Sequence, residues 1–441
     1  MPALAIETRL LSGWGRATRS RATVVRPRAA DELAAALAAA GPRGLLARGL
    51  GRAYGDAAQN AGGHVVEMTG LEGIHAFDAE RGEVTVAAGT SLEMLARATM
   101  PRGWFPAVVP GTRFVTVGGA IAADVHGKNH HRDGGFGRHV RALTLLTADG
   151  GRHRLLPGSD AFAATVGGMG LTGVIADATL RLVRLPSGIV REEVTRTRDL
   201  SDLLGRMAAD DDEHRYSVAW VDAAAGDLGR GLLLRGDHAP AGEAATLPPA
   251  RLRAPRRAPA ALLGGPTVRV FNALWLRRSR PGTHVRLTPL AAFFWPLDGV
   301  RGWNRLYGER GLIQYQCVVP DGTEAVLRRI LDAGRRAGIL SPLAVLKRLG
   351  DGEGPIAFAM RGWTLALDFR AAAPGLDRML DRFDDWVCEA GGRVYLAKDA
   401  RLRPCALRAM YPRLDEWQAT RERLDPAGGL RSDLQRRLEL A

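Results

Sequence analysis

Three glycine-rich blocks in the first 175 residues constrain the fold of this chain more than any other feature. They are residues 48–56 (RGLGRAYGD), 116–131 (TVGGAIAADVHGKNHH) and 167–175 (GGMGLTGVI). The first follows the apolar residues 45–47, and the third leads into a predicted strand. Because glycine has no Cβ, backbone N–H groups at such turns can approach a flat ligand or a pyrophosphate. Tyr54 stands at the third glycine position of G-x-G-x-x-G, so the first block is not a Rossmann fingerprint.

The hydrophobic periodicity predicts an α+β fold. Residues 20–185 alternate short elements with turns, and helices are predicted at 31–40 and 91–99 and strands at 83–87, 140–147, 153–156 and 175–182. After about residue 187 the helices lengthen, with apolar faces at 326–331 and 376–387. Strands are predicted between them, at 216–222, 313–319, 363–369 and 393–397.

The scarcity of lysine is the second constraint. Only three of the 61 lysine and arginine residues are lysine, namely Lys128, Lys347 and Lys398. An isolated lysine can survive on a surface by chance. However, a lysine amine is compact and loses its proton readily on burial, whereas arginine stays charged. All three lysines also lie in segments that other features single out, so we expect them at a functional site.

The net charge of +14 and the sequence pI of about 10.7 favour anionic partners. The charge is spread along the chain without aromatic interleaving, so no nucleic-acid partner is predicted. Residues 239–266 are rich in Pro, Ala and Arg and are expected to form a mobile loop that buries little apolar surface. No signal peptide or transmembrane run is apparent, and the three cysteines indicate free thiols.

No metal site is predicted. His126, His130 and His131 lie close in sequence, but carboxylate or cysteine partners at ligand spacing are missing. Gln314 and Gln316 are two apart on a predicted strand and should share one face. That face is either part of a site or a solvated polar stripe.

The three glycine-rich blocks, in this order and spacing, resemble the PCMH-type FAD-binding domain of the vanillyl-alcohol-oxidase-type flavoenzymes. Further blocks, FGRHV, WNRLYG, QYQ, YLAKDAR and AMYPRLDEW, narrow the resemblance to the decaprenylphosphoryl-ribose 2-oxidases, the flavin half of a two-enzyme epimerase. It runs from about residue 10 to the C-terminus. It implies a two-lobed FAD-binding domain at 1–187, completed by 393–441. The remaining residues, 188–392, would form a substrate domain built on an antiparallel sheet with flanking helices, and the loop at 239–266 would belong to it.

The resemblance also implies how the cofactor is held. The implied FAD-binding residues are Ala47, Arg48, Gly49, Leu50, Gly51, Arg52, Ala53, Tyr54, Gly55, Asp56, Ala57, Gly111, Thr116, Val117, Gly118, Gly119, Ala123, Asp124, Val125, His126, Ile175 and Tyr395. Many enzymes of this fold attach FAD covalently through a histidine in a Gly-His-Ser setting. Here the matching residues read Gly51-Arg52-Ala53. Because arginine cannot form that bond, noncovalent FAD is predicted.

By the same resemblance, the substrate would contact Tyr54, Lys128, Trp220, Gln314, Gln316 and Lys347. Lys398 is the expected base or hydroxyl anchor, since burial near a flavin lowers the pKa of an amine, and His126 is the alternative. Lys398 could instead simply pair with Asp399 or another carboxylate. Tyr395 and Lys398 are three apart, so the strand must end or bend near Ala397 for both to reach one ligand.

The implied reaction is FAD-dependent oxidation of the 2-hydroxyl of a polyprenyl-phosphoryl-β-D-ribose to the 2-keto sugar. This is the first half of an epimerisation that yields the arabinose donor for cell-wall arabinan. The implied partners are a quinone-like electron acceptor, an NAD-dependent reductase and an anionic membrane surface. The expected location is peripheral at the inner membrane, on its cytoplasmic or periplasmic side.

Two alternatives stay open. One is an alditol or aldonolactone oxidase of the same fold, which would act on free sugars. The other is a cofactor-free basic protein that binds nucleic acid or membranes. The colour of the purified protein separates the second alternative from both enzymes.

Overall fold

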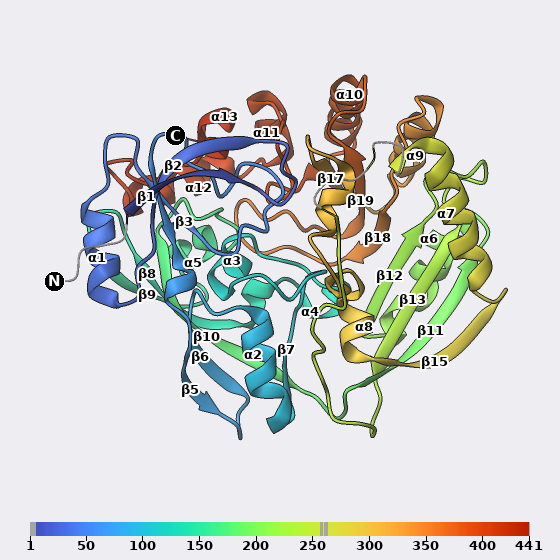
Figure 1. The fold of residues 1–441 in the computed structure, drawn as a ribbon, viewed down its shortest axis with the longest axis horizontal. Helices are drawn as coiled ribbons and strands as arrows, with labels where there is room; N and C mark the ends of the chain where they lie inside the picture. Colours follow the sequence, from blue (N-terminus) through green and yellow to red (C-terminus); the bar gives the residue numbers. More distant parts are fainter. Residues whose placement is uncertain (1–5, 256–258, 260–262, 441) are drawn as a thin grey trace.

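The computed structural model describes residues 6–255, 259 and 263–440. Two sheets form the N-terminal region (Figure 1). The first has the order β1 (Ile6–Ser12), β2 (Arg19–Val25), β4 (His64–Glu67), β3 (Leu45–Arg48). The second has the order β5 (Ile74–Asp78), β6 (Glu83–Ala87), β10 (Val174–Arg184), β8 (Val140–Leu146), β9 (Arg152–Leu155), with β7 (Trp104–Pro106) also paired to β10. Helix α1 (Ala30–Ala38) packs on the first sheet. Helices α2 (Leu92–Thr99), α3 (Val117–Ala122) and α5 (Asp160–Thr165) bury their apolar residues against the second.

An eight-stranded antiparallel sheet forms the other side of the molecule (Figure 1). Its order is β15 (Thr283–Pro289), β11 (Ile189–Thr197), β13 (Gly231–His238), β12 (Tyr216–Val221), β18 (Ala344–Leu349), β19 (Gly362–Arg370), β17 (Leu312–Pro320), β20 (Arg393–Val394). Helices α6 (Leu200–Asp210), α9 (Ala325–Arg336) and α10 (Leu376–Glu389) share one core with residues such as Tyr315 and Leu365. Since strand residues alternate between faces, Gln314, Gln316 and Thr364 point to the opposite face.

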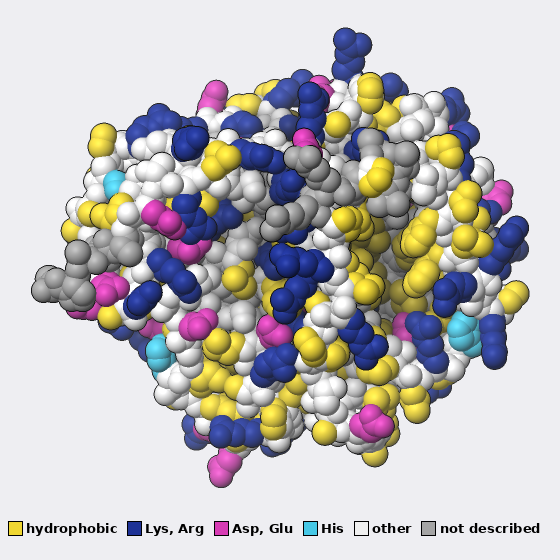
Figure 2. Space-filling model, in the orientation of Figure 1, with side chains coloured by type: hydrophobic (Ala, Val, Ile, Leu, Met, Phe, Trp, Pro, Cys, Tyr) yellow, Lys and Arg dark blue, Asp and Glu magenta, His cyan; other side chains and the backbone are white. Residues whose placement is uncertain are grey.

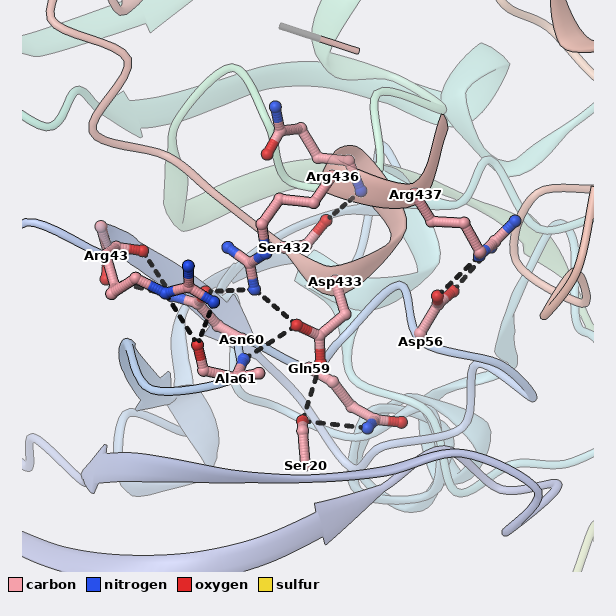
Figure 3. A network of polar contacts seen from close by, with 12 residues as sticks. Ser20, Arg43, Asp56, Gln59, Asn60, Ala61, Ser432, Asp433, Arg436 and Arg437 are labelled. Carbon is pink, nitrogen blue, oxygen red and sulfur yellow. Dashed lines mark hydrogen bonds and ion pairs between the residues drawn. The ribbon is translucent and has the colours of Figure 1, made fainter. Parts of the chain in front are cut away.

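The C-terminal helices return to the N-terminal sheets (Figure 1). They are α11 (Pro404–Met410), α12 (Leu414–Leu424) and α13 (Asp433–Leu438). Trp417 Nε1 donates to Ala164 O at 3.0 Å, and Asp433 accepts hydrogen bonds from Ser20 and from the backbone of Ala61 (Figure 3). These contacts join the C-terminal helices to the N-terminal region, and the division into domains at 1–187 with 393–441 and at 188–392 stays a prediction. Strand β20 itself belongs to the large sheet.

The α+β class predicted from the periodicity is confirmed. The segment 239–266 buries more apolar surface than expected, because Leu247 and Ala254 are buried. Within it, β14 (Leu252–Arg253) pairs with β16 (Val300–Arg301). Helix α7 (Gly265–Arg278) begins inside the segment, and the short helices α4 (His130–Asp133) and α8 (Leu290–Phe294) complete the fold. Residues 256–258 and 260–262 of the predicted loop lie outside the described residues. Its mobility stays a prediction.

Candidate active site

A cavity of about 340 Å³ lies between the glycine-rich blocks and the open face of the eight-stranded sheet. Its size is within the range of small-molecule and cofactor sites. All three glycine-rich blocks contribute to one wall, and β17, β18 and β19 contribute to the other. Residues nearly 400 positions apart in the sequence, from Trp14 to Lys398, therefore meet around one space.

The first block has the features of a cradle for a pyrophosphate. Among the hydrogen bonds of the described residues, none is donated by the backbone N–H groups of residues 50–53, although these residues line the cavity. A Cβ at Gly49 would overlap the hydroxyl of Thr116. That hydroxyl caps α3 by accepting from Gly119 N at 3.1 Å, so it is not free to move away. Unpaired N–H groups on a glycine-rich turn suit phosphate oxygens, and the residues present fit FAD.

Most of the implied cofactor residues line this cavity. They are Ala47, Arg48, Gly49, Leu50, Gly51, Arg52, Ala53, Tyr54, Ala57, Gly111, Thr116, Gly118, Gly119, Ala123, Val125, His126, Ile175 and Tyr395. The structure places Gly55, Asp56, Val117 and Asp124 behind the wall. Asp56 pairs with Arg437, Val117 is in the core, and Asp124 accepts from Gly137 N at 2.9 Å.

Arg52 is the residue for which the resemblance implies noncovalent FAD. Its guanidinium lies 4.0 Å from the centre of the Trp14 ring, and its buried Nε has no hydrogen-bond partner among the described residues. Burial lowers the pKa of this guanidinium. A buried donor without a partner is costly, so this N–H is available to an acceptor on a bound group.

Lys398 reaches the cavity from a turn. Strand β20 ends at Val394, and Lys398 N donates to Tyr395 O at 2.9 Å. Both Tyr395 and Lys398 therefore line the cavity, as the sequence argument required. Lys398 Nζ lies 3.8 Å from the centre of the Tyr54 ring. Burial lowers the pKa of Lys398 to about 8, and the charge of Asp368 opposes this effect.

Lys347 of β18 and His126 of the second glycine-rich block form the centre of a polar chain that joins the two walls. Lys347 Nζ lies 2.9 Å from His126 Nδ1, and Gln316 Nε2 lies 2.8 Å from His126 Nε2 and 3.0 Å from Thr364 Oγ1. Burial, and then the charge of Lys398, lower the pKa of Lys347 to about 7. Burial, and then the charge of Lys347, hold the pKa of His126 well below its usual value. His126 is thus neutral near pH 7.

A charged Lys347 fixes which nitrogen of a neutral His126 carries the proton. A charged amine can only donate to Nδ1, which leaves Nε2–H to donate to the amide oxygen of Gln316. A neutral amine can accept from Nδ1–H, and Nε2 then accepts from the amide nitrogen. The chain therefore couples the protonation of Lys347 to the hydrogen bond that Gln316 makes, and both side chains line the cavity.

A buried carboxylate lies under the wall formed by the eight-stranded sheet. Asp368 accepts from Tyr307 OH at 3.1 Å and from Gln314 Nε2. Burial raises the pKa of Asp368 to about 6. Gln314 and Gln316 both line the cavity, which confirms the shared face predicted from their spacing. Burial raises the pKa of Tyr54 well above its usual value, so this phenol stays protonated.

Lys128 and Trp220 are not among the residues that line the cavity. Lys128 Nζ donates to Phe293 O and lies 4.0 Å from the centre of the Phe293 ring. Trp220 pairs with Val345 across β12 and β18, so it is on the cavity face of the sheet. There it is covered by Leu276 of α7. Both residues lie beside the site rather than in its wall.

Several wall residues have no local signal in the sequence. The unpredicted wall residues with large or polar side chains are Trp14, Met68, Thr112, Val115, Thr165, Met169, Leu297, Trp303, Leu343, Val345 and Thr364. The last three are found by extending the period-two argument from Gln314 and Gln316 to the neighbouring strands. Trp14, Leu297 and Trp303 come from loops whose positions depend on the tertiary fold.

Comparison with known proteins agrees with this geometry. A family model described as an FAD binding domain matches residues 22–156. A second model, described as D-arabinono-1,4-lactone oxidase, matches residues 365–438. The decaprenylphosphoryl-beta-D-ribose oxidase of Mycolicibacterium smegmatis is 41% identical, over 98% of this chain and 98% of its own. An uncharacterized protein of Streptomyces coelicolor is 42% identical, over 79% of this chain and 100% of its own.

An alditol oxidase of a Streptomyces species is 28% identical over only 39% of this chain and 41% of its own. The similarity to the mycolicibacterial oxidase, by contrast, extends through both walls of the cavity. FAD is the cofactor, and the chain is an FAD-dependent oxidoreductase. The chain therefore belongs to the family of the decaprenylphosphoryl-beta-D-ribose oxidases.

Proposed function

We propose that this protein oxidises the 2-hydroxyl of a polyprenyl-phosphoryl-β-D-ribose to the 2-keto sugar, as the first half of an epimerisation. The observation that carries the proposal is the pair of low-pKa lysines, Lys347 and Lys398, opposite a glycine-rich FAD cradle. The full-length relative named for decaprenylphosphoryl ribose supports the choice of substrate.

The chemistry requires an acceptor for a hydride and an acceptor for a proton. Bound FAD supplies the hydride acceptor, and residues 49–53, Thr116 and Gly118–Gly119 would hold it. Lys398, with its pKa near 8, is partly neutral at physiological pH and can take the hydroxyl proton. His126 lines the same cavity, and its low pKa leaves a neutral imidazole as the alternative acceptor.

The remaining wall residues would orient the sugar. Gln314, Gln316 and Lys347 line the cavity and would contact the sugar, and Tyr54 stays protonated and can donate to a sugar oxygen. Because neither Lys128 nor Trp220 reaches the wall, we assign them a supporting position behind Phe293 and α7. FAD is held noncovalently in this proposal, since Arg52 cannot bond to it.

The proposal extends to partners and to the product. The keto sugar would pass to an NAD-dependent reductase that completes the conversion to the arabinose donor for cell-wall arabinan. A quinone-like acceptor would reoxidise the flavin. A lipid-linked substrate requires contact with a membrane, and the excess of arginine suits an anionic one. None of the helices among the described residues is long and apolar enough to cross a bilayer.

Anaerobic flavin reduction tests this function. The holoenzyme is mixed with a polyprenyl-phosphoryl ribose, with free alditols and with aldonolactones, and the loss of flavin absorbance is followed. We expect bleaching by the phosphoryl ribose alone. Bleaching by alditols or lactones alone would favour the second enzymatic function. A protein that takes up no FAD would refute both.

Acid precipitation tests the mode of attachment. We expect a colourless pellet, with all FAD in the supernatant. A yellow pellet would contradict the noncovalent assignment.

A further inference from the structure

Helix α7 carries an apolar face that is turned to solvent. Only Val268, Asn272 and Leu276 are buried, and they form one narrow stripe along the helix. Val270, Phe271, Leu274 and Trp275 are 60%, 54%, 55% and 46% exposed. The rings of Phe271 and Trp275 stack with centroids 6.3 Å apart. We call these four residues the α7 apolar face. Figure 2 shows hydrophobic side chains gathered on the side where α7 lies in Figure 1.

Monomeric proteins seldom leave four large apolar side chains together on one exposed helix. The buried stripe already packs α7 against the protein, so the exposed apolar side chains do not stabilise the helix in water. Two adjacent aromatic rings on that face add area that suits the boundary between head groups and acyl chains. The face therefore indicates a docking surface.

The charges around the α7 apolar face indicate which kind of partner binds there. Residues 244–297 contain nine arginines and no aspartate or glutamate. Arg269, Arg277 and Arg278 are on α7 itself and exposed, and among the described residues no ion pair joins them to a carboxylate. Arginines at the rim of an apolar face complement phosphate head groups. A second copy of the chain would bring the same arginines together without any carboxylate from this segment to balance them.

The α7 apolar face lies next to the proposed substrate site. Leu276, on the inner stripe, packs in a cluster with Trp220, and Leu343 packs against that cluster. Leu343 also lines the cavity. One layer of side chains therefore separates α7 from the end of the cavity formed by Leu343 and Val345.

We infer that the α7 apolar face is the surface by which this enzyme docks on an anionic membrane, next to the end of the cavity that receives a lipid-linked substrate. The docking surface thus consists of the α7 apolar face and the exposed arginines of α7, Arg269, Arg277 and Arg278. This inference rests on the proposed function for the substrate's lipid tail, but the docking itself can be measured without turnover.

Vesicle binding by the FAD-loaded full chain tests the inference. The probe is a vesicle of phosphatidylcholine with about one-third phosphatidylglycerol, and the readout is co-sedimentation. We expect the wild type to bind these vesicles and F271S/W275S to bind them about tenfold more weakly or worse. In R277Q/R278Q, vesicle binding should lose most of its dependence on salt concentration. Vesicles of phosphatidylcholine alone should bind poorly.

The matched control is L287S. Leu287 is 70% exposed on β15, and its pairing with Arg191 puts it on the sheet face opposite to α7. This variant should bind vesicles like the wild type. Unchanged binding by F271S/W275S would overturn the inference, as would equal losses in L287S. A dimer in solution that F271S/W275S dissociates, without vesicle binding by the wild type, would assign the face to a second copy instead.

The two proposals fail separately. A short-chain, water-soluble prenyl-phosphoryl ribose should reduce the flavin of F271S/W275S as fast as that of the wild type. If this analogue reduces neither protein while vesicles still bind, the proposed reaction is wrong and the docking surface stands.

Discussion

Lys398 and Lys347 lie on one wall of the cavity, and the ammonium form of each disfavours the ammonium form of the other. The two lysines have different roles because their amines contact different groups. Lys347 Nζ lies 2.9 Å from His126 Nδ1, whereas Lys398 lies over the Tyr54 ring and its amine forms no hydrogen bond with another described side chain. A low-pKa amine without such a bond is the better proton acceptor.

Lys398→Arg keeps the positive charge and the contact with Tyr54 but removes the titratable amine. We expect the variant to bind FAD normally, and its anaerobic flavin reduction to be about 100-fold slower or more. Stopped-flow absorbance measures the rate, and the visible spectrum of the resting protein controls for bound FAD. Reduction at the wild-type rate would transfer the role of base to His126.

The pH dependence of flavin reduction should depend on Asp368. The charge of this carboxylate raises the pKa of Lys398. Neutral Lys398 is the active form, so the rate should rise with pH to a plateau with its midpoint near 8. Asp368→Asn removes the charge, lowers the pKa of Lys398, and should therefore move the midpoint to lower pH.

Tyr307→Phe is the matched control for this variant. It removes one hydrogen bond to the same side chain, at 3.1 Å, but leaves the carboxylate in place. Its midpoint should stay near that of the wild type. Equal midpoints in Asp368→Asn and the wild type would show that the rate does not report the charge of Lys398.

The glycine turn after β3 and the start of α3 form one structural element. Gly49 packs on Thr116, whose hydroxyl is buried and caps the helix through Gly119 N. Gly49→Ala would force these two segments apart, since the threonine cannot turn away without losing the cap. We expect the purified variant to retain much less FAD than the wild type, as measured by its absorbance ratio.

Gly205→Ala is the control for that substitution. Gly205 is inside α6, with nothing within 4 Å of the position of an added Cβ. Alanine there should raise the free energy of unfolding by roughly 0.5–1 kcal/mol and leave FAD content unchanged. Similar loss of FAD in both variants would mean that the packing of Gly49 on Thr116 is not the cause.

Helices and strands are predicted best where the apolar side chains follow a single period without interruption. Strand β6 has the predicted bounds Glu83–Ala87, and Gln314 and Gln316 share the predicted face. The predicted strand 393–397 corresponds to β20, which ends at Val394. The residues that follow form a turn, and the apolar pattern of the sequence does not mark where this turn begins. Spacing also could not show that α7 covers Trp220, since that contact joins segments more than 50 residues apart.

At the scale of the whole molecule, the C-terminal helix α13 contacts segments from both walls of the cavity. Arg437 donates two hydrogen bonds of 2.8 Å to Asp56 (Figure 3), and it lies 2.9 Å from Asp399. Asp56 is the last residue of the first glycine-rich block, and Asp399 directly follows Lys398. Tyr54 N also donates to Ala397 O at 2.9 Å, so the cradle and the lysine turn are in backbone contact.

Arg437→Met would leave Asp56 and Asp399, each 5% exposed, without their cation. Removing one partner of a buried ion pair typically costs about 3–5 kcal/mol, and here one arginine serves two carboxylates. We therefore expect a large drop in the free energy of unfolding, weaker FAD binding and slower flavin reduction in the same variant. Chemical denaturation and FAD titration measure the first two.

Arg413→Met supplies the comparison, because Arg413 and Glu416 form an ion pair that is mostly exposed. Exposed pairs contribute little, so this variant should unfold and bind FAD like the wild type. If Arg437→Met lowered stability but left FAD affinity and flavin reduction intact, α13 would hold the fold together without positioning the site. A joint loss of all three would mean that the last turn of the chain sets the distance between the cradle and Lys398.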